Sequence, residues 1–228
     1  MGGVSVDPRE QRRTYRASHL SESELAPSWL DQFRAWFADA SAAVAEGRLA
    51  EANAMVFATA TPDGVPSART VLLKGYDARG FVLFTNLGST KALEAAANPR
   101  ASLVFPWFTL ERQVVVAGTV TPVDRAESEA YFHSRPHGSQ LGAWASPQSR
   151  VITGREMLER RRDALGARWP ATVPAPPFWG GLRVAPVSVE FWQGRPDRLH
   201  DRLRWRVVPA AGQPGAAGPE WIVERLAP

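Results

Sequence analysis

The residues best suited to chemistry are three basic side chains near the C-terminus, Arg198, His200 and Arg202. If this segment is an extended strand, alternate side chains project to one face, so these three lie together. Two large aromatic residues, Phe191 and Trp192, precede them across a Gly-Arg-Pro turn. A solvated edge strand also carries such charges. The apolar wall beside a cationic face favours instead a site for a flat, phosphorylated ligand.

A second candidate site is the turn at residues 85–91, where an expected strand ends and a helix begins. The free N–H groups and the positive dipole end of a helix N-terminus attract anions. Ser89 or Thr90 serves equally well as a helix N-cap, so a cap and a phosphate site both remain open here. Only two of the 27 basic residues are lysines, Lys74 and Lys91, and both lie in candidate ligand segments. We therefore expect their ammonium groups to contact a ligand.

Two weaker clusters accompany these sites. Arg135 and Ser139 follow the end of an expected helix and offer donors to a ligand. Polar groups that suit hydrogen bonds to a heterocycle at a barrel mouth stand at Arg112, Gln113, Gln148 and Ser149.

Composition narrows the class of protein. A chain of 228 residues buries roughly 70% of its extended surface, which is enough for a sizeable core. No apolar run approaches the length of a membrane span and no signal peptide is indicated, so a soluble, cytoplasmic protein is expected. With no cysteine and four histidines, we expect no metal. The net charge of +4 comes from dispersed arginines, and the basic helix expected at residues 155–168 is interpreted as a solvated face, so no nucleic-acid partner is expected.

Hydrophobic periodicity predicts an α+β protein with a mobile arm at residues 1–25 and one domain at residues 26–228. Helices are expected at residues 29–44, 89–97, 125–134 and 154–168, the last two separated by a loop rich in Ser, Gly and Gln. Strands are expected at residues 55–59, 68–74, 81–85, 101–105, 113–120, 182–192, 198–205 and 221–225. A proline-rich connector is expected at residues 170–177 and a flexible hairpin loop at residues 209–219. Short turns between strands indicate antiparallel pairing and closure into a small barrel.

Several strings of residues occur in the order typical of one family. They are RTVLLK at 69–74, FTNLGS at 84–89, RQ at 112–113, YFHSRP at 131–136, SQLGAW at 139–144, QS at 148–149, WGG at 179–181, EFWQG at 190–194, RLHDR at 198–202 and RLAP at 225–228. From about Arg12 to Pro228 the sequence resembles the pyridoxine (pyridoxamine) 5′-phosphate oxidase family. The resemblance implies an FMN-binding antiparallel split β-barrel with peripheral helices, and a homodimer that holds each flavin between two subunits.

The resemblance also implies which residues meet each ligand. The cofactor contacts would be Arg69, Thr70, Val71, Leu72, Leu73, Lys74, Phe84, Thr85, Ser89, Thr90, Lys91, Gln113, Gln148, Ser149, Trp192 and Arg202. The substrate contacts would be Lys74, Tyr131, Arg135, Ser139, Arg198 and His200, with Arg12 and Tyr15 of the arm closing over the site. Arg198 and His200 would lie against the substrate ring opposite the flavin and are the candidate catalytic residues. Since Arg69 and Lys74 fall on opposite faces of a regular strand, both can serve one site only if the strand twists or its backbone also contributes.

Two positions depart from the family pattern. Thr90 stands where the family usually has arginine, and Phe84 where a tyrosine or similar aromatic is common, so weaker FMN binding is expected. The implied reaction oxidises pyridoxine or pyridoxamine 5′-phosphate to pyridoxal 5′-phosphate and reduces O₂ to H₂O₂. One alternative is a flavin reductase or an oxidase of another metabolite, such as a phenazine-pathway relative, against which residues 135–136 and 198–200 argue. Another is a non-catalytic carrier of flavin or pyridoxal phosphate.

Overall fold

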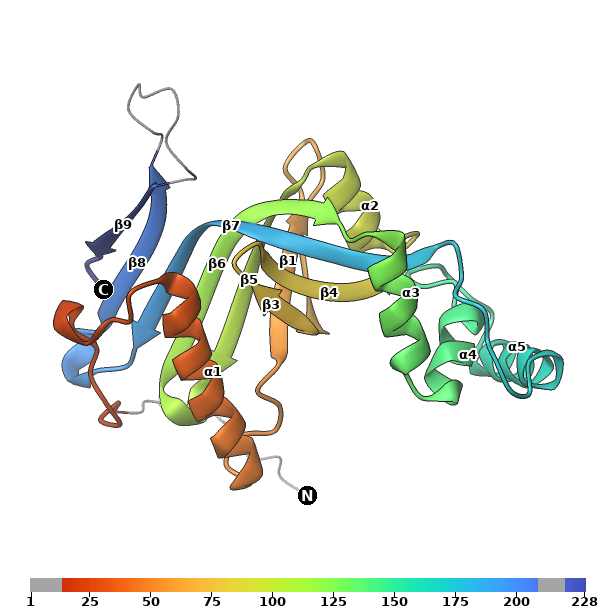
Figure 1. Ribbon diagram of the computed structural model, residues 1–228, viewed down its shortest axis with the longest axis horizontal. Helices are drawn as coiled ribbons and strands as arrows, with labels where there is room; N and C mark the ends of the chain where they lie inside the picture. Colours follow the sequence, from red (N-terminus) through yellow and green to blue (C-terminus); the bar gives the residue numbers. More distant parts are fainter. Residues whose placement is uncertain (1–13, 209–219) are drawn as a thin grey trace, which may run out of the picture. The chain divides into compact units, whose positions relative to one another are not determined.

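The computed structural model describes residues 14–208 and 220–228 (Figure 1). The chain divides into two compact units, each assembled from segments that are distant in the sequence. The first unit comprises Met1–Ala52, Pro106–Val114 and Glu190–Pro228, and the second comprises Asn53–Phe105 and Val115–Val189. The predicted division into an arm and one domain stays a prediction, and the predicted loop at residues 209–219 lies outside the described residues.

The β-structure is antiparallel in each strand pair whose register is known. The strands are β1 (Ala54–Ala60), β2 (Pro66–Leu72), β3 (Gly75–Asp77), β4 (Gly80–Asn86), β5 (Arg100–Trp107), β6 (Arg112–Pro122), β7 (Trp179–Gln193), β8 (Asp201–Val208) and β9 (Glu220–Arg225). Within the described residues the sheet order is β2-β1-β5-β6-β7-β4-β3, with β8 paired to β7 and β9 to β8. Each strand predicted from the sequence overlaps one of these strands.

Strand β1 of the second unit buries one of its faces. In β1 the side chains of Met55, Phe57 and Thr59 are buried and alternate with half-buried neighbours, as a period of two requires. The turn from β3 into β4 needs glycine at Gly80, because φ is +128° and a Cβ atom there would lie 2.1 Å from the carbonyl oxygen of Val184. This glycine therefore allows close packing of β4 on β7.

Four α-helices belong to the second unit, namely α2 (Thr90–Ala97), α3 (Arg125–Ser134), α4 (His137–Ala145) and α5 (Arg155–Arg168). Figure 1 shows α3, α4 and α5 grouped beside one end of β4. The prediction of a loop between the helices at residues 125–134 and 154–168 is wrong, because α4 forms there. Leu141 of α4 packs with Phe132, Val173 and Trp179, and the Gln140 side chain donates to the carbonyl of Arg135 at 2.7 Å. Burial and this bond outweigh the low helix propensity of the Ser and Gly residues.

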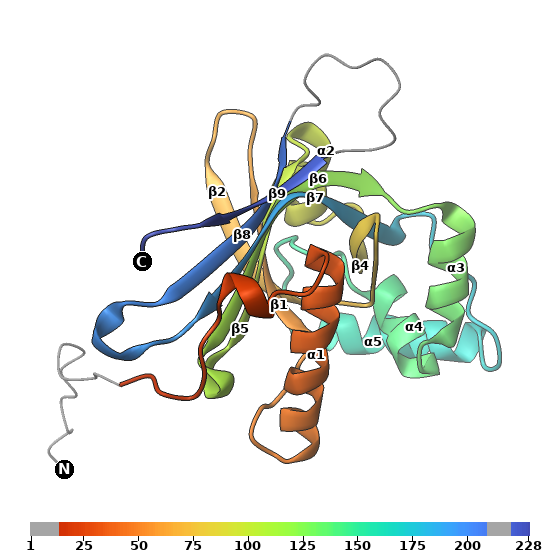
Figure 2. The ribbon, with the colours of Figure 1, turned by 60° about the vertical axis from the view of Figure 1, so that its left-hand side comes forward.

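The first unit contains α1 (Trp29–Ala45) and the antiparallel pair of β8 and β9. Figure 2 shows β8 and β9 side by side. Ser28 caps α1 by accepting a hydrogen bond from the N–H of Asp31 at 3.1 Å. Three aromatic residues in the core of this unit contact one another: the rings of Trp36 and Phe191 lie edge-on at 5.2 Å between centres, and those of Phe191 and Trp205 also lie at 5.2 Å. These contacts fix the start of the segment that carries the basic C-terminal residues.

The prediction that a strand begins at residue 198 is wrong, because β8 begins at Asp201. Pro196, Asp197 and Arg198 form a 3₁₀ turn, in which Asp197 and Arg198 have φ values of 54° and 63°. These left-handed conformations are incompatible with a strand. The alternation that was expected to align Arg198, His200 and Arg202 therefore does not exist, and of the three only Arg202 lies on a strand.

Among the described residues, no helix is long and apolar enough to cross a membrane.

Candidate functional site

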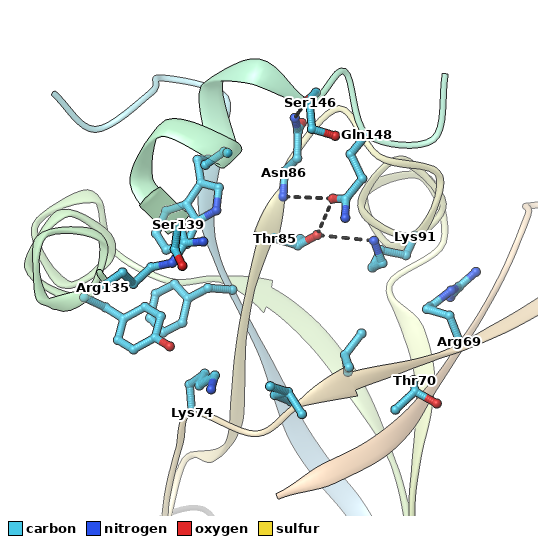
Figure 3. Close-up of a pocket in the computed structure, with 17 residues that line it drawn as sticks. Arg69, Thr70, Lys74, Thr85, Asn86, Lys91, Arg135, Ser139, Ser146 and Gln148 are labelled. Atoms are coloured by element: carbon cyan, nitrogen blue, oxygen red, sulfur yellow. Dashed lines mark hydrogen bonds between the residues drawn. The ribbon is translucent and has the colours of Figure 1, made fainter. Parts of the chain in front are cut away.

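The second unit contains a pocket of about 630 Å³ that gathers most of the predicted ligand residues (Figure 3). The predicted residues that line it are Arg69, Thr70, Val71, Leu72, Lys74, Phe84, Thr85, Lys91, Tyr131, Arg135, Ser139 and Gln148. They come from β2, β4, α2, α3, α4 and the segments that flank them. A pocket of this size is large enough for a cofactor-sized ligand.

The end of β2 explains how Arg69 and Lys74 reach the same pocket. The strand stops at Leu72 and β3 begins at Gly75, so Lys74 lies in the break between two strands. The backbone N–H of Lys74 donates to the carbonyl of Val82 at 2.8 Å, which fixes this break. The side chain of Leu73 is buried, with 4% exposed, and does not line the pocket.

One side of the pocket is suited to an anion. The Lys91 ammonium is buried, with its Nζ 3.4 Å from the hydroxyls of Thr85 and Ser89. Burial lowers the pKa of Lys91, and the nearby charge of Arg69 lowers it further. Ser89 is the N-cap residue of α2, yet its hydroxyl accepts no capping hydrogen bond. Two cations and a helix N-terminus thus converge where an anion would relieve their repulsion.

Thr90 lies at the same helix start and is exposed. Its backbone N–H donates to the Ser149 hydroxyl at 3.2 Å, and Ser149 has a left-handed φ of 69°. The predicted contacts Thr90 and Ser149 therefore lie beside Lys91 although they do not line the pocket.

Aromatic rings and a second cation form another side of the pocket. Phe84 stacks on Tyr131 at 4.2 Å and on Trp179 at 5.4 Å, and the Arg135 guanidinium lies 4.9 Å above Trp179. Among the described residues, Arg135 Nη1 is the buried side-chain nitrogen with no hydrogen-bond partner. Burial lowers the pKa of Arg135. A buried cationic donor without a partner is costly, so this nitrogen points to a missing acceptor.

Gln148 joins the two sides. Its side-chain oxygen accepts from the Thr85 hydroxyl at 3.1 Å and from the backbone N–H of Asn86 at 3.3 Å. Figure 3 shows these bonds above the end of β4, with Lys91 on one side and Arg135 and Ser139 on the other. Both bonds use the amide oxygen, so they orient the NH₂ group as a donor.

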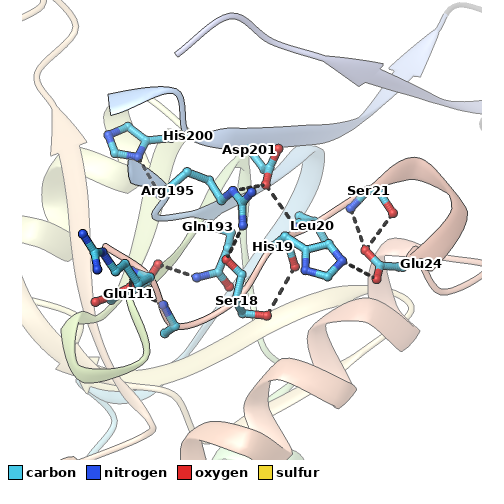
Figure 4. Close-up of polar contacts among 12 residues, drawn as sticks. Ser18, His19, Leu20, Ser21, Glu24, Glu111, Gln193, Arg195, His200 and Asp201 are labelled. Carbon is cyan, nitrogen blue, oxygen red and sulfur yellow. Dashed lines mark hydrogen bonds and ion pairs between the residues drawn. The ribbon is translucent and has the colours of Figure 1, made fainter. Parts of the chain in front are cut away.

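The remaining predicted residues belong to the first unit. His200 lies 4.5 Å from Trp192 and 5.7 Å from Tyr15, ring centre to ring centre. The backbone N–H of Arg195 donates to His200 Nδ1 at 3.0 Å (Figure 4), so the neutral imidazole carries its proton on Nε2. Burial lowers the pKa of His200, and the charge of Arg198 adds to this effect.

Arg198 and Arg202 have different surroundings. Arg198 is exposed in its turn, whereas Arg202 pairs with both carboxylate oxygens of Glu190 at 2.7 and 3.1 Å. Gln113 is half-buried in β6, and Arg12 lies outside the described residues. That Gln113, Trp192, Arg198, His200 and Arg202 act together with the pocket stays a prediction.

Sequence reasoning missed several residues. Asn86, Ser146 and Trp179 also line the pocket. Asn86 and Trp179 had a signal, within the FTNLGS and WGG strings, and Ser146 had none. Glu111 has a left-handed φ of 55°, is buried, and accepts from the backbone N–H groups of Arg16 and Ala17 at 2.7 and 2.8 Å. It thereby holds the segment that carries Tyr15. Nothing in the sequence around Glu111 indicates this contact.

No group of three or more His, Cys, Asp or Glu side chains in the described part of the chain is arranged to hold a metal.

Comparison with known proteins identifies the family. Residues 40–166 match the family model described as pyridoxamine 5′-phosphate oxidase, and residues 179–228 match that of the pyridoxine 5′-phosphate oxidase C-terminal dimerisation region. A pyridoxine/pyridoxamine 5′-phosphate oxidase from Frankia alni is 59% identical over 97% of this chain and 89% of its own length. The protein of the same name from Salinispora arenicola is 56% identical over 99% of this chain and 98% of its own length.

Two solved structures are similar. PhzG from Burkholderia lata, in complex with tetrahydrophenazine-1-carboxylic acid, has a TM-score of 0.80 and 28% identity over 90% of this chain and 95% of its own. A pyridoxamine 5′-phosphate oxidase-related, FMN-binding protein from Nostoc punctiforme has a TM-score of 0.65 and 20% identity over 90% and 100%. The fold is thus the α+β antiparallel split barrel that the resemblance implied, in the class of flavoprotein oxidoreductases. The chain belongs to the pyridoxine/pyridoxamine 5′-phosphate oxidase family.

Proposed function

We propose that this protein is an FMN-dependent oxidase that converts pyridoxine or pyridoxamine 5′-phosphate to pyridoxal 5′-phosphate, with O₂ as acceptor and H₂O₂ as product. The alcohol substrate gives its two hydrogens to O₂ overall, and the amine substrate also takes up water and releases ammonia. The observation that carries the proposal is the unpartnered Arg135 Nη1, buried against aromatic rings in a pocket that holds a separate cationic side at Arg69 and Lys91. Two anionic groups, one on a cofactor and one on a substrate, match these two sides.

The residues of the pocket fit FMN at the Lys91 side. Arg69, Lys91 and the α2 N-terminus are suited to hold its phosphate, and Gln148 offers an oriented amide to a heterocycle. Bound there, the flavin would supply the hydride and O₂ chemistry that side chains cannot. The protein's part is to orient the flavin ring, exclude water and bind the charged phosphate groups.

The substrate phosphate is assigned to Lys74, Arg135, Tyr131 and Ser139. Arg135 is stacked on Trp179, which limits its rotation and directs its donors into the pocket. A phosphate there would satisfy the unpartnered nitrogen with a charge-assisted hydrogen bond. The His200 Nε2–H group is proposed as a donor to the substrate ring. Arg198 is proposed to act beside it.

We also propose a homodimer in which each flavin lies between two subunits. The match of residues 179–228 to a dimerisation region supports this assembly. The region includes the proposed flavin residues Trp192 and Arg202 as well as Arg198 and His200. A sedimentation measurement that finds only monomer at micromolar concentration would contradict this assembly.

A second candidate, oxidation of a non-phosphorylated metabolite, is favoured by the similarity to PhzG and its carboxylic-acid ligand. The test measures O₂ consumption by the FMN-loaded protein with pyridoxine 5′-phosphate, pyridoxamine 5′-phosphate and their dephosphorylated forms. The proposal predicts one H₂O₂ and one pyridoxal 5′-phosphate for each O₂ consumed, and a strong preference for the phosphorylated substrates. Equal or faster turnover of the dephosphorylated forms would favour the second candidate instead.

A further inference from the structure

The Arg69 guanidinium is held from behind by the strands on which it lies. Its Nη1 donates to the carbonyl of Phe57 at 3.0 Å and to the hydroxyl of Thr59 at 2.7 Å, and its Nη2 donates to the hydroxyl of Ser67. With 22% of its side chain exposed, Arg69 presents only part of its surface to the pocket. The direction in which it meets a ligand therefore depends on these acceptors.

The two hydroxyls are themselves oriented by Glu94 of α2. One carboxylate oxygen, Oε2, accepts from Thr59 Oγ1 and Ser67 Oγ, both at 2.5 Å, and lies 3.6 Å from Arg69 Nη2. A hydroxyl has one proton. Because each hydroxyl donates its single hydrogen bond to Glu94, the lone pairs of both hydroxyl oxygens are left to accept from Arg69. These hydrogen bonds lower the pKa of Glu94, which keeps the carboxylate ionised at neutral pH.

The Glu94 carboxylate also balances charge in this part of the pocket. Arg69 lies close enough to Lys91 to lower the pKa of Lys91, so the two cations repel each other. Glu94 is largely buried, with 11% of its side chain exposed, and stands beside Arg69. It therefore keeps Arg69 fixed near Lys91 when no anion is bound.

We propose that Glu94 is a positioning residue for the cofactor phosphate, acting through Thr59 and Ser67 to fix the Arg69 guanidinium. This inference rests on the proposed function, since it takes the phosphate of FMN as the ligand of Arg69. A purely electrostatic role predicts the opposite sign, because removing an acidic group near a phosphate would strengthen binding. The two roles are therefore separable by one affinity measurement.

The experiment titrates FMN and riboflavin, which lacks the phosphate, into the full-length flavin-free protein and its variants. Glu94→Ala should weaken FMN binding about tenfold, which is 1.4 kcal/mol, and leave riboflavin binding unchanged. Glu94→Gln should recover most of the loss, because its amide oxygen still accepts hydrogen bonds from the hydroxyls. The matched control is Glu156→Ala, which removes an exposed acidic residue of α5.

Three results would overturn the inference. FMN affinity that is unchanged or higher in Glu94→Ala assigns Glu94 an electrostatic role or none. An equal loss of riboflavin and FMN binding shows damage to the fold instead of to the phosphate side. Absence of FMN binding by the unsubstituted protein overturns the proposed function as well, so the two failures are distinguishable. If Glu94→Ala does not fold, Ser67→Ala removes one bridging hydroxyl and must weaken FMN while sparing riboflavin.

Discussion

Replacing Arg135 with methionine should separate substrate binding from stability. In the free protein, Arg135 Nη1 is buried without a partner among the described residues, and the guanidinium lies against Trp179 and Phe132. A buried unsatisfied donor costs about 1–3 kcal/mol, more when it is charged. Methionine fills a similar volume and packs well against aromatic rings. Arg135→Met should therefore keep or raise the melting temperature of the substrate-free protein.

The same substitution should damage turnover. A hydrogen bond from a charged donor to a phosphate contributes about 1.5–3 kcal/mol. Since about 1.4 kcal/mol corresponds to a factor of ten, kcat/KM for pyridoxamine 5′-phosphate should fall by roughly 10- to 150-fold. Turnover of dephosphorylated pyridoxamine should change far less, because that substrate offers no phosphate to Arg135.

The assay combines steady-state O₂ consumption, flavin content and thermal melting. Arg160→Met serves as the matched control, because Arg160 is exposed on α5. If Arg135→Met melts several degrees lower or loses its flavin, Arg135 is a structural residue and not a ligand of the substrate phosphate. An unchanged kcat/KM for the phosphorylated substrate would equally show that its phosphate binds elsewhere.

Three other predictions address the remaining parts of the site. Thr90→Arg should raise the affinity for FMN, because it adds a cation beside the α2 N-terminus. Unchanged affinity in titrations at two salt concentrations would show that Thr90 does not face the phosphate. Arg198→Ala should reduce kcat/KM for pyridoxine 5′-phosphate at least about tenfold and leave the flavin content intact. Arg202→Ala leaves Glu190 without its bidentate partner and should lower flavin occupancy. Loss of flavin in Arg198→Ala would contradict this assignment of roles. The pKa of His200 is lowered in the folded protein, so just below pH about 6.5 the folded protein binds fewer protons at His200 than the unfolded chain does. The contribution of His200 to the free energy of unfolding should therefore rise with pH in that range. An NMR titration midpoint at or above that value would contradict this.

The sequence predicted the elements whose signals are local. The helix expected at residues 29–44 forms as α1, because helical periodicity is visible without tertiary information, and alternation in β1 shows which side chains are buried. The turn at Ser89 and Lys91 could be proposed as a candidate anion site because a strand end and a helix start are both visible in the sequence. Its residues line or adjoin the pocket.

The sequence failed where distant contacts decide the conformation. Helix α4 forms because Leu141 packs with Val173 and Trp179, residues more than thirty positions away, and a local pattern rich in Gly and Ser does not show this burial. Arg198 does not lie on a strand, because the turn that begins at Pro196 includes Arg198. The proline was visible, but the length of the turn was not. Glu94 acts through hydroxyls on two strands, a contact that only the paired sheet reveals.

The most direct test of the proposed oxidase is the reaction of its flavin without oxygen. Purified protein loaded with FMN is mixed anaerobically with pyridoxamine 5′-phosphate, and the visible absorbance of the flavin is followed before air is admitted. The proposal predicts bleaching of the oxidised flavin with formation of one pyridoxal 5′-phosphate per flavin, and recovery of the colour with H₂O₂ when O₂ enters. A flavin that stays oxidised with saturating substrate, or a protein that binds no FMN, would contradict it.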